Sequence, residues 1–154
     1  MTGWRLGWLV VPQALVSVFE KLAQNLFICP STIAQHAALA CFHPESLALY
    51  EERRHEFKRR RDFLVPALRS IGFQVPVMPD GAFYVYADIS AVAHEASGDS
   101  AAFCMDVRRQ TGVAIVPGAD FGAAAPARHV RLSYATSLPR IEEALARMGR
   151  LFGR

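Results

Sequence analysis

Cysteine is scarce in this chain of 154 residues, and its spacing excludes two kinds of site. The three cysteines, Cys29, Cys41 and Cys104, are odd in number and form no CxxC pair. No histidines accompany them at ligand spacing, so neither a disulfide scaffold nor a structural zinc site is predicted, and no metal is expected. We expect the cysteines to be core thiols in a reducing compartment, the cytoplasm.

Long hydrophobic runs and charge of one sign are also lacking. No stretch approaches the ~18 consecutive apolar residues that a membrane span requires. The N-terminus has neither the basic flank nor the small-residue cleavage site of a signal peptide. The formal net charge is only +3, and basic residues are dispersed among acidic ones over most of the chain. We therefore expect a soluble, cytoplasmic protein with no membrane and no nucleic-acid partner.

One basic run leaves a nucleic-acid alternative open. Lys58–Arg61 holds four basic residues in succession. Acidic residues flank the run at Glu52, Glu56 and Asp62, which is more typical of a solvated helix face than of a binding patch. Binding of nucleic acid through Arg53–Arg61 is the minor interpretation, and its signature would be a steep dependence on salt.

Familiar catalytic motifs are absent as well. The sequence contains no GxSxG, no HExxH and no glycine-rich phosphate loop, and its five histidines show no metal-ligand spacing. Hydrolase and nucleotide-binding functions are therefore weak interpretations.

What is present predicts a globular α+β chain. Apolar residues make up 52% of the sequence, enough for a core. Their spacing predicts, in order, a strand over 4–11, helices over 13–25, 32–40 and 45–73, a strand over 82–89, a helix over 100–111, strands over 113–118 and 129–135, and a helix over 138–152. The change of composition near Pro44 predicts a domain boundary there.

Several residues predict where helices begin and end. Thr32 with Gln35 three residues later resembles a capping box. Asp99 and Gly112 are typical of the N-cap and the C-terminal glycine of the helix between them. The small residues over 37–40 predict close packing of their helix against a sheet.

Two arginines stand in apolar strand patterns. Arg5 is the only arginine among the first fifty residues, and its guanidinium either reaches water or binds an anion through its planar fork. Arg131 lies between Val130 and Leu132, which point the other way along the strand, so a surface-facing arginine is the simplest interpretation. Residue type alone leaves both alternatives open.

Five blocks of sequence, in order, give these arginines a context: MTGWRLGW, PSTIAQHAALA, DGAFYVYADIS, GVAIVPGADFG and HVRLSYATS. In sequence and spacing they resemble the C-terminal half of class I and II aminotransferases, which are fold-type I pyridoxal phosphate enzymes. The resemblance covers essentially the whole chain. It implies an α/β family fold of which this chain is an α+β part. Residues 1–43 would end the large cofactor-binding domain, and residues 44–154 would form the linking helix and the small domain.

The resemblance also implies a cofactor, substrates and site residues. The cofactor is pyridoxal 5'-phosphate, the substrates are an α-amino acid and a 2-oxo acid, and family members are usually homodimers. Arg5, in the GWR motif, would bind the cofactor phosphate. Arg131, in the VRLS strand, would bind the substrate α-carboxylate. Phe83, in the GAFY block, would line the substrate pocket, and a plain core role for it stays open.

The catalytic residue of the family is not matched in this sequence. In the family the Schiff-base lysine lies four residues before the position of Met1, and the chain's two lysines, Lys21 and Lys58, match it neither in position nor in context. Because that lysine both holds the cofactor and moves the proton, we expect a fragment of an aminotransferase that is inactive by itself. The alternative is a non-catalytic interaction module with an exposed apolar surface that includes Trp4 and Trp8.

Overall fold

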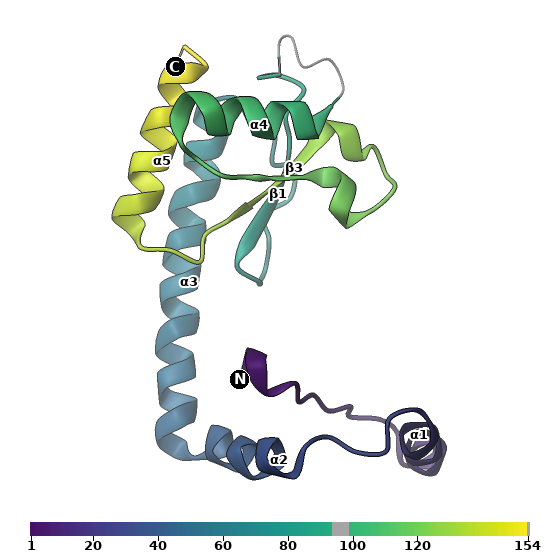
Figure 1. The fold of residues 1–154 in the computed structure, drawn as a ribbon. Helices are drawn as coiled ribbons and strands as arrows, with labels where there is room; N and C mark the ends of the chain where they lie inside the picture. Colours follow the sequence, from purple (N-terminus) through teal and green to yellow (C-terminus); the bar gives the residue numbers. More distant parts are fainter. Residues whose placement is uncertain (94–98, 154) are drawn as a thin grey trace. The chain divides into compact units, whose positions relative to one another are not determined.

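The computed structural model describes residues 1–93 and 99–153. Its elements, in chain order, are η1 (Thr2–Trp4), α1 (Gln13–Leu26), α2 (Thr32–Leu39), η2 (Ala40–Phe42), α3 (Pro44–Ser70), β1 (Tyr84–Asp88), α4 (Ser100–Thr111), β2 (Val116–Pro117), η3 (Gly118–Phe121), η4 (Pro126–Arg128), β3 (His129–Ser133) and α5 (Leu138–Leu151) (Figure 1). The chain is therefore α+β, as its sequence predicts. It divides into two compact units, Met1–Arg53 and Arg54–Arg154.

The second unit is built on a small antiparallel sheet with the strand order β1-β3-β2. In the central strand β3, Val130 lies opposite Ala87 of β1 and Pro117 of β2. Alternate side chains of a strand face opposite sides of the sheet, so Val85 and Leu132 share one face with Val130 and Ala87. That face is apolar and buried.

Helices cover this apolar face. The C-terminal part of α3, α4 and α5 lie against the sheet in Figure 1, and their inward residues join the strand residues in one core. The core consists of Leu64, Val65, Leu68, Ile71, Phe73, Val75, Val85, Ala87, Ile89, Val92, Phe103, Cys104, Val107, Val130, Leu132, Tyr134, Ile141, Leu145 and Met148. The side chains on the opposite face of the sheet do not belong to this core.

The helices of the second unit follow the sequence signals. The carboxylate of Asp99 accepts a hydrogen bond from the Ala101 backbone N–H at 2.9 Å, and Gly112 adopts φ 72° at the end of α4. Both predicted caps are confirmed. The helix α3 continues through Pro66 and ends at Ser70, three residues before the predicted end.

The first unit contains helices and no strand. The predicted strand over 4–11 is wrong: Thr2–Trp4 form a 3₁₀ turn, and residues 5–12 have no regular structure. A strand exists through its hydrogen-bonded neighbour, and no segment of residues 1–53 pairs with this one. The same absence overturns the expectation that the small residues over 37–40 pack on a sheet, although Ala38 is buried.

The N-terminus of α2 also differs from the prediction. Ser31, with φ −54° and ψ 130°, occupies the N-cap, so Thr32 is already helical and cannot cap. The Gln35 side chain donates to the Pro30 carbonyl at 2.9 Å instead of closing a capping box.

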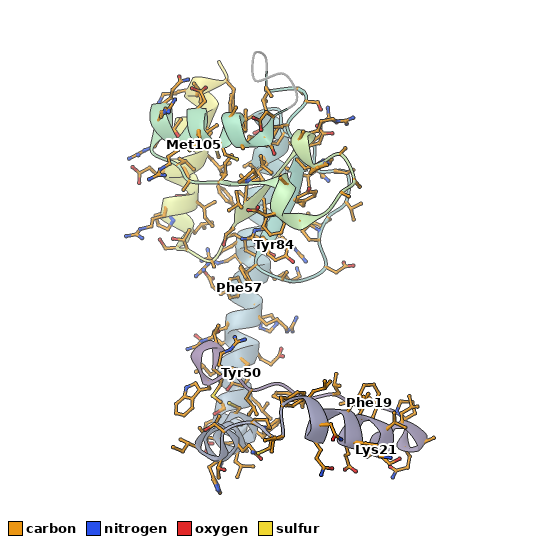
Figure 2. The ribbon with its side chains drawn as sticks, turned by 45° about the vertical axis from the view of Figure 1, so that its right-hand side comes forward. Phe19, Lys21, Tyr50, Phe57, Tyr84 and Met105 are labelled. Carbon is orange, nitrogen blue, oxygen red and sulfur yellow. The ribbon has the colours of Figure 1, made fainter. Side chains whose placement is uncertain are left out.

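The helix α1 has the predicted span but buries little. The four residues of its apolar stripe are between 39% and 52% exposed: Leu15, Val18, Phe19 and Leu22. Figure 2 shows Phe19 and Lys21 projecting from opposite sides of the helix. Among residues 1–53, all of which the structure describes, only Ala34 and Ala38 are buried. The first unit therefore has almost no core of its own.

The expectation of core thiols holds for one cysteine of three. Cys104 is buried on α4, Cys41 is half-buried and Cys29 is exposed. The two that differ belong to the first unit, which offers little interior. None of the helices in residues 1–93 and 99–153 combines the length and apolar character needed to cross a membrane.

Candidate functional site

Polar and aromatic side chains occupy the face of the sheet that the helices leave uncovered. Tyr84 and Tyr86 come from β1, and His129 and Arg131 come from β3, because all four alternate with the buried residues. The Tyr86 and His129 rings stack in parallel with their centroids 4.9 Å apart. Tyr84, labelled in Figure 2, packs diagonally across the strands against Arg131.

Two aromatic rings surround the Arg131 guanidinium. Its Cζ lies 4.1 Å from the centroid of the Phe121 ring and 5.2 Å from that of Tyr84. Its Nε is buried and has no hydrogen-bond acceptor, which makes it the one such side-chain atom in the described part of the chain. A buried N–H without an acceptor costs roughly 1–3 kcal/mol. A positive group in this state suits an anion, above all a carboxylate or a phosphate.

A tightly packed glycine places the loop that carries Phe121. A Cβ on Gly118 would lie 2.6 Å from the carbonyl oxygens of both His129 and Pro126, and 2.7 Å from the Tyr86 hydroxyl. Only glycine fits such a close approach of backbone to backbone. The Ser100 hydroxyl accepts from the Gly118 N–H at 3.3 Å and donates to the Pro126 carbonyl at 3.1 Å. The start of η3 is therefore fixed to both α4 and η4.

Phe83 lies just before β1 and is 47% exposed, so the interpretation of it as a core residue is wrong. Its backbone follows Ala82, whose φ of 65° is left-handed. The buried Tyr134 holds this turn, because its N–H donates to the Phe83 carbonyl at 2.8 Å and its hydroxyl to the Ala82 carbonyl at 3.0 Å. Burial raises the pKa of Tyr134, so the phenol stays a neutral donor.

Arg5 belongs to the first unit and is exposed. Its backbone adopts φ 52° and ψ 44°, the left-handed region that a residue other than glycine rarely occupies. Strained backbone of this kind gathers at functional sites. Arg5 and Arg131 lie in different compact units.

The two lysines are surface residues of helices. Lys21 is exposed on α1. On α3 the Lys58 ammonium donates to Asp62 at 2.9 Å. The basic run around Lys58 is paired in the same way, since hydrogen bonds from Arg59 and Arg60 lower the pKa of Glu56 to about 2.

No group of histidine, cysteine, aspartate or glutamate residues in the described ranges could hold a metal ion. Sequence reasoning missed Tyr84, Phe121 and Gly118 as parts of the Arg131 site. The period of two in AFYVYADI could have placed Tyr84 on the face of Arg131. Nothing in GADFG signals that its phenylalanine turns back over β3.

Comparison with known proteins gives this fold and site a family. A family model described as aminotransferase class I and II matches residues 1–148. The chain is 44% identical over 149 residues to a valine–pyruvate aminotransferase of Mycobacterium tuberculosis, covering 97% of this chain and 37% of the relative. It is 38% identical to an aspartate/prephenate aminotransferase of Thermus thermophilus, covering 100% of this chain and 38% of the relative.

Solved structures agree. A crystal structure of an aminotransferase from Mycobacterium tuberculosis matches with a TM-score of 0.86 at 44% identity, over 99% of this chain and 38% of that one. An aromatic aminotransferase from Pyrococcus horikoshii matches with a TM-score of 0.80 at 36% identity, over 99% of this chain and 40% of that one. The chain belongs to the class I and II aminotransferases. It spans less than half the length of these relatives, as the resemblance to a C-terminal half predicts.

Proposed function

We propose that this chain provides the carboxylate-binding part of an aminotransferase, which transfers an amino group between an α-amino acid and a 2-oxo acid. Both kinds of substrate carry a carboxylate beside the reacting carbon, so a single guanidinium can hold either. Arg131 is the residue proposed for this task. The observation that carries the proposal is the buried Nε of Arg131, which lacks an acceptor inside an aromatic surround.

The class I and II aminotransferases, to which this chain belongs, use pyridoxal phosphate as their cofactor. When bound, it supplies the electron sink for the reaction. We propose that Arg5 binds the phosphate of the cofactor, because a planar guanidinium can donate two parallel hydrogen bonds to phosphate oxygens. The left-handed backbone of Arg5 also marks a position under constraint. We further propose residues 1–43 as part of the cofactor domain and residues 44–154 as the linking helix and small domain.

Phe83 is proposed to line the substrate pocket. Support comes from its exposure and from the rigid turn before β1, in which Tyr134 fixes the backbone on both sides of it. The ring lies edge-on to that of Tyr84, with centroids 5.4 Å apart. This contact connects Phe83 with the aromatic surround of Arg131.

The 154 residues alone are proposed to lack the covalent step. Lys58 is paired with Asp62 and Lys21 projects from an exposed helix, so neither is set up as the amine that holds the cofactor. Borohydride reduction with added pyridoxal phosphate, followed by mass spectrometry and an amino-transfer assay, tests this. Sparse labelling without turnover is expected. Stoichiometric labelling of one lysine with turnover would overturn it. We propose amino-group transfer and homodimer formation for the longer chain architecture of the relatives, and not for these 154 residues alone.

Carboxylate binding tests the function of Arg131 directly. Pyruvate, the simplest 2-oxo acid, is titrated into the chain while backbone amide resonances are followed by NMR. We expect shifts at residues of β1 and β3, and a loss of binding of at least tenfold in Arg131→Gln, since a charge-assisted bidentate pair is worth roughly 1.5–3 kcal/mol. The exposed Arg109→Gln is the matched control. Equal binding by wild type and Arg131→Gln would refute the proposal.

A further inference from the structure

We propose that Phe121 is a positioning residue for Arg131: its ring, with that of Tyr84 on the other strand, holds the guanidinium in place before a carboxylate arrives. The inference rests on the proposed function of Arg131 and adds to it the residue that sets the guanidinium's orientation. Phe121 does not touch the substrate in this proposal. It acts through the arginine.

The first support is geometric. At 4.1 Å, the Phe121 centroid is the nearer of the two rings to the Arg131 Cζ, against 5.2 Å for Tyr84. Both distances fall inside the ~6 Å range of a cation–π contact. The two rings are thus near neighbours of the guanidinium, and its buried Nε has no hydrogen-bond acceptor that could fix the side chain instead.

The second support is how Phe121 is placed. The ring ends the short helix η3, whose first residue, Gly118, is packed against the carbonyls of Pro126 and His129. The buried Ser100 hydroxyl ties the same residue to α4. A loop anchored this firmly delivers the ring to one position. Phe121 is nevertheless 42% exposed, so burial in the core does not account for its place.

The third support comes from β1. The antiparallel register sets Tyr84 opposite Ser133 and Tyr86 opposite Arg131, which leaves Tyr84 diagonal to Arg131 on the same face, within reach of a long side chain. Tyr86 is engaged elsewhere, in its parallel stack on His129. One ring from β1 and one from η3 therefore share the guanidinium.

Holding an arginine in advance has a defined effect on binding. A free arginine side chain has considerable rotamer entropy, part of which is lost when a ligand fixes it. Rings that already restrict the side chain reduce this loss, which strengthens binding without a new contact to the ligand. Removal of the Phe121 ring is expected to weaken carboxylate binding between about fivefold and thirtyfold, the upper part of the range for one cation–π contact, because the Arg131 Nε is buried.

The first experiment observes the guanidinium itself. Arginine Nε–H signals of the full chain are recorded by ¹H–¹⁵N NMR, and the Arg131 signal is assigned by its loss in Arg131→Gln. We expect an upfield, ring-shifted and slowly exchanging Nε–H in the wild type. Phe121→Leu should move this signal toward the signals of exposed arginines. Phe121→Tyr, which keeps an aromatic ring, should leave it near its wild-type position. Gly118→Ala, which displaces η3, should act like Phe121→Leu. An unchanged Arg131 signal in Phe121→Leu would overturn the proposal.

The second experiment measures pyruvate affinity in the same variants. Phe121→Leu should bind between about fivefold and thirtyfold more weakly and Phe121→Tyr within about twofold of wild type. Met105→Leu, an exposed substitution on α4, is the matched control. If Arg131→Gln abolishes binding while Phe121→Leu binds normally, the positioning role is wrong and the function of Arg131 stands. If Arg131→Gln binds normally, the proposed function fails, and the Nε–H signal still decides whether Phe121 holds the guanidinium.

Discussion

Asp88, at the end of β1, is a buried carboxylate whose charge is held by two neighbours. It is 6% exposed. It accepts from the Arg128 guanidinium at 2.6 Å and from the Ser90 N–H at 2.7 Å. Burial by itself raises the pKa of Asp88, but the hydrogen bonds from Ser90 and Arg128 outweigh it and lower the pKa to about 2. The pair joins the end of β1 to the residue just before β3.

Stability should therefore depend on pH through Asp88. Its folded pKa lies below its ordinary value of 3.8, so the contribution of ~2 kcal/mol is complete above about pH 5 and is lost as pH falls toward 2. Asp88→Asn should lower the free energy of unfolding by about that amount at pH 7 and by almost nothing at pH 2. Urea unfolding followed by circular dichroism measures both. The exposed Asp106→Asn is the control, and an equal effect at both pH values would contradict the assignment.

Cysteine reactivity should differ between the two units. Burial, with the nearby Asp99 charge adding to it, raises the pKa of the Cys104 thiol to about 11, whereas Cys29 is exposed. Because the thiolate is the reactive form, iodoacetamide at pH 8 should alkylate Cys29 at least tenfold faster than Cys104. Mass spectrometry of peptides over time measures the rates. In denaturant the difference should vanish, and equal rates in the native chain would be inconsistent with a buried Cys104.

The alternation of its strand, with Val130 and Leu132 on the buried side, predicts only that Arg131 faces outward, and its proposed role comes from the resemblance of the VRLS strand to the family. The sequence could place Tyr84 on the outward face of its own strand, but it could not bring Tyr84 and Phe121 together around Arg131. Tyr84 belongs to another strand and Phe121 to a loop, and only the antiparallel register and the close packing of Gly118 bring them to the guanidinium. Contacts set by tertiary packing leave no local signal.

At the scale of elements, α4 shows capping at both ends. The Asp99 carboxylate satisfies the Ala101 N–H, one of the donors that a helix start leaves free. Asp99→Ala should lower the free energy of unfolding by about 1 kcal/mol, and Asp99→Ser should recover most of it. Chemical denaturation of the three proteins measures the difference. A serine variant no better than alanine would show that the side-chain hydrogen bond is not what stabilises this end.

The elements that the sequence predicts well are those with local causes. The caps of α4, helical periodicity and the alternation of β1 and β3 all act within a few residues, whereas the predicted capping box at Thr32 is wrong. The segment over 4–11 has the alternation of a strand but no partner in residues 1–53, and its hydrogen bonds depend on what lies beside it. A strand is thus predictable from its own residues only when its neighbours are present.

At the scale of the whole molecule, the two units differ in how much they bury. Residues 1–53 bury only Ala34 and Ala38, while Trp8, Val10 and Ile28 are between 68% and 94% exposed. Trp8 and Val10 also line a groove of about 930 Å³ beside α1. Exposed apolar surface on this scale marks an interface or a site of association.

The first unit should therefore be the less stable part. Amide hydrogen exchange measured by mass spectrometry should be fast over 1–43 and at least a hundredfold slower in β1, β3 and α5, because local opening costs little where few apolar side chains are buried. A dye that binds apolar surface, such as ANS, should fluoresce with the native chain. Strong protection over 1–43 at the lowest protein concentration would contradict this.

The two faces of the sheet in the second unit have different parts in the fold. Val85, Ala87, Val130 and Leu132 serve the core, and the residues between them do not. Substitutions on the outward face should therefore disturb the core less than substitutions on the inward face, except where a side chain is closely held, as the Tyr86 hydroxyl is beside Gly118. Sequence divergence on this sheet is therefore expected to cost less stability on one side than on the other, since surface substitutions away from packed features usually have small effects.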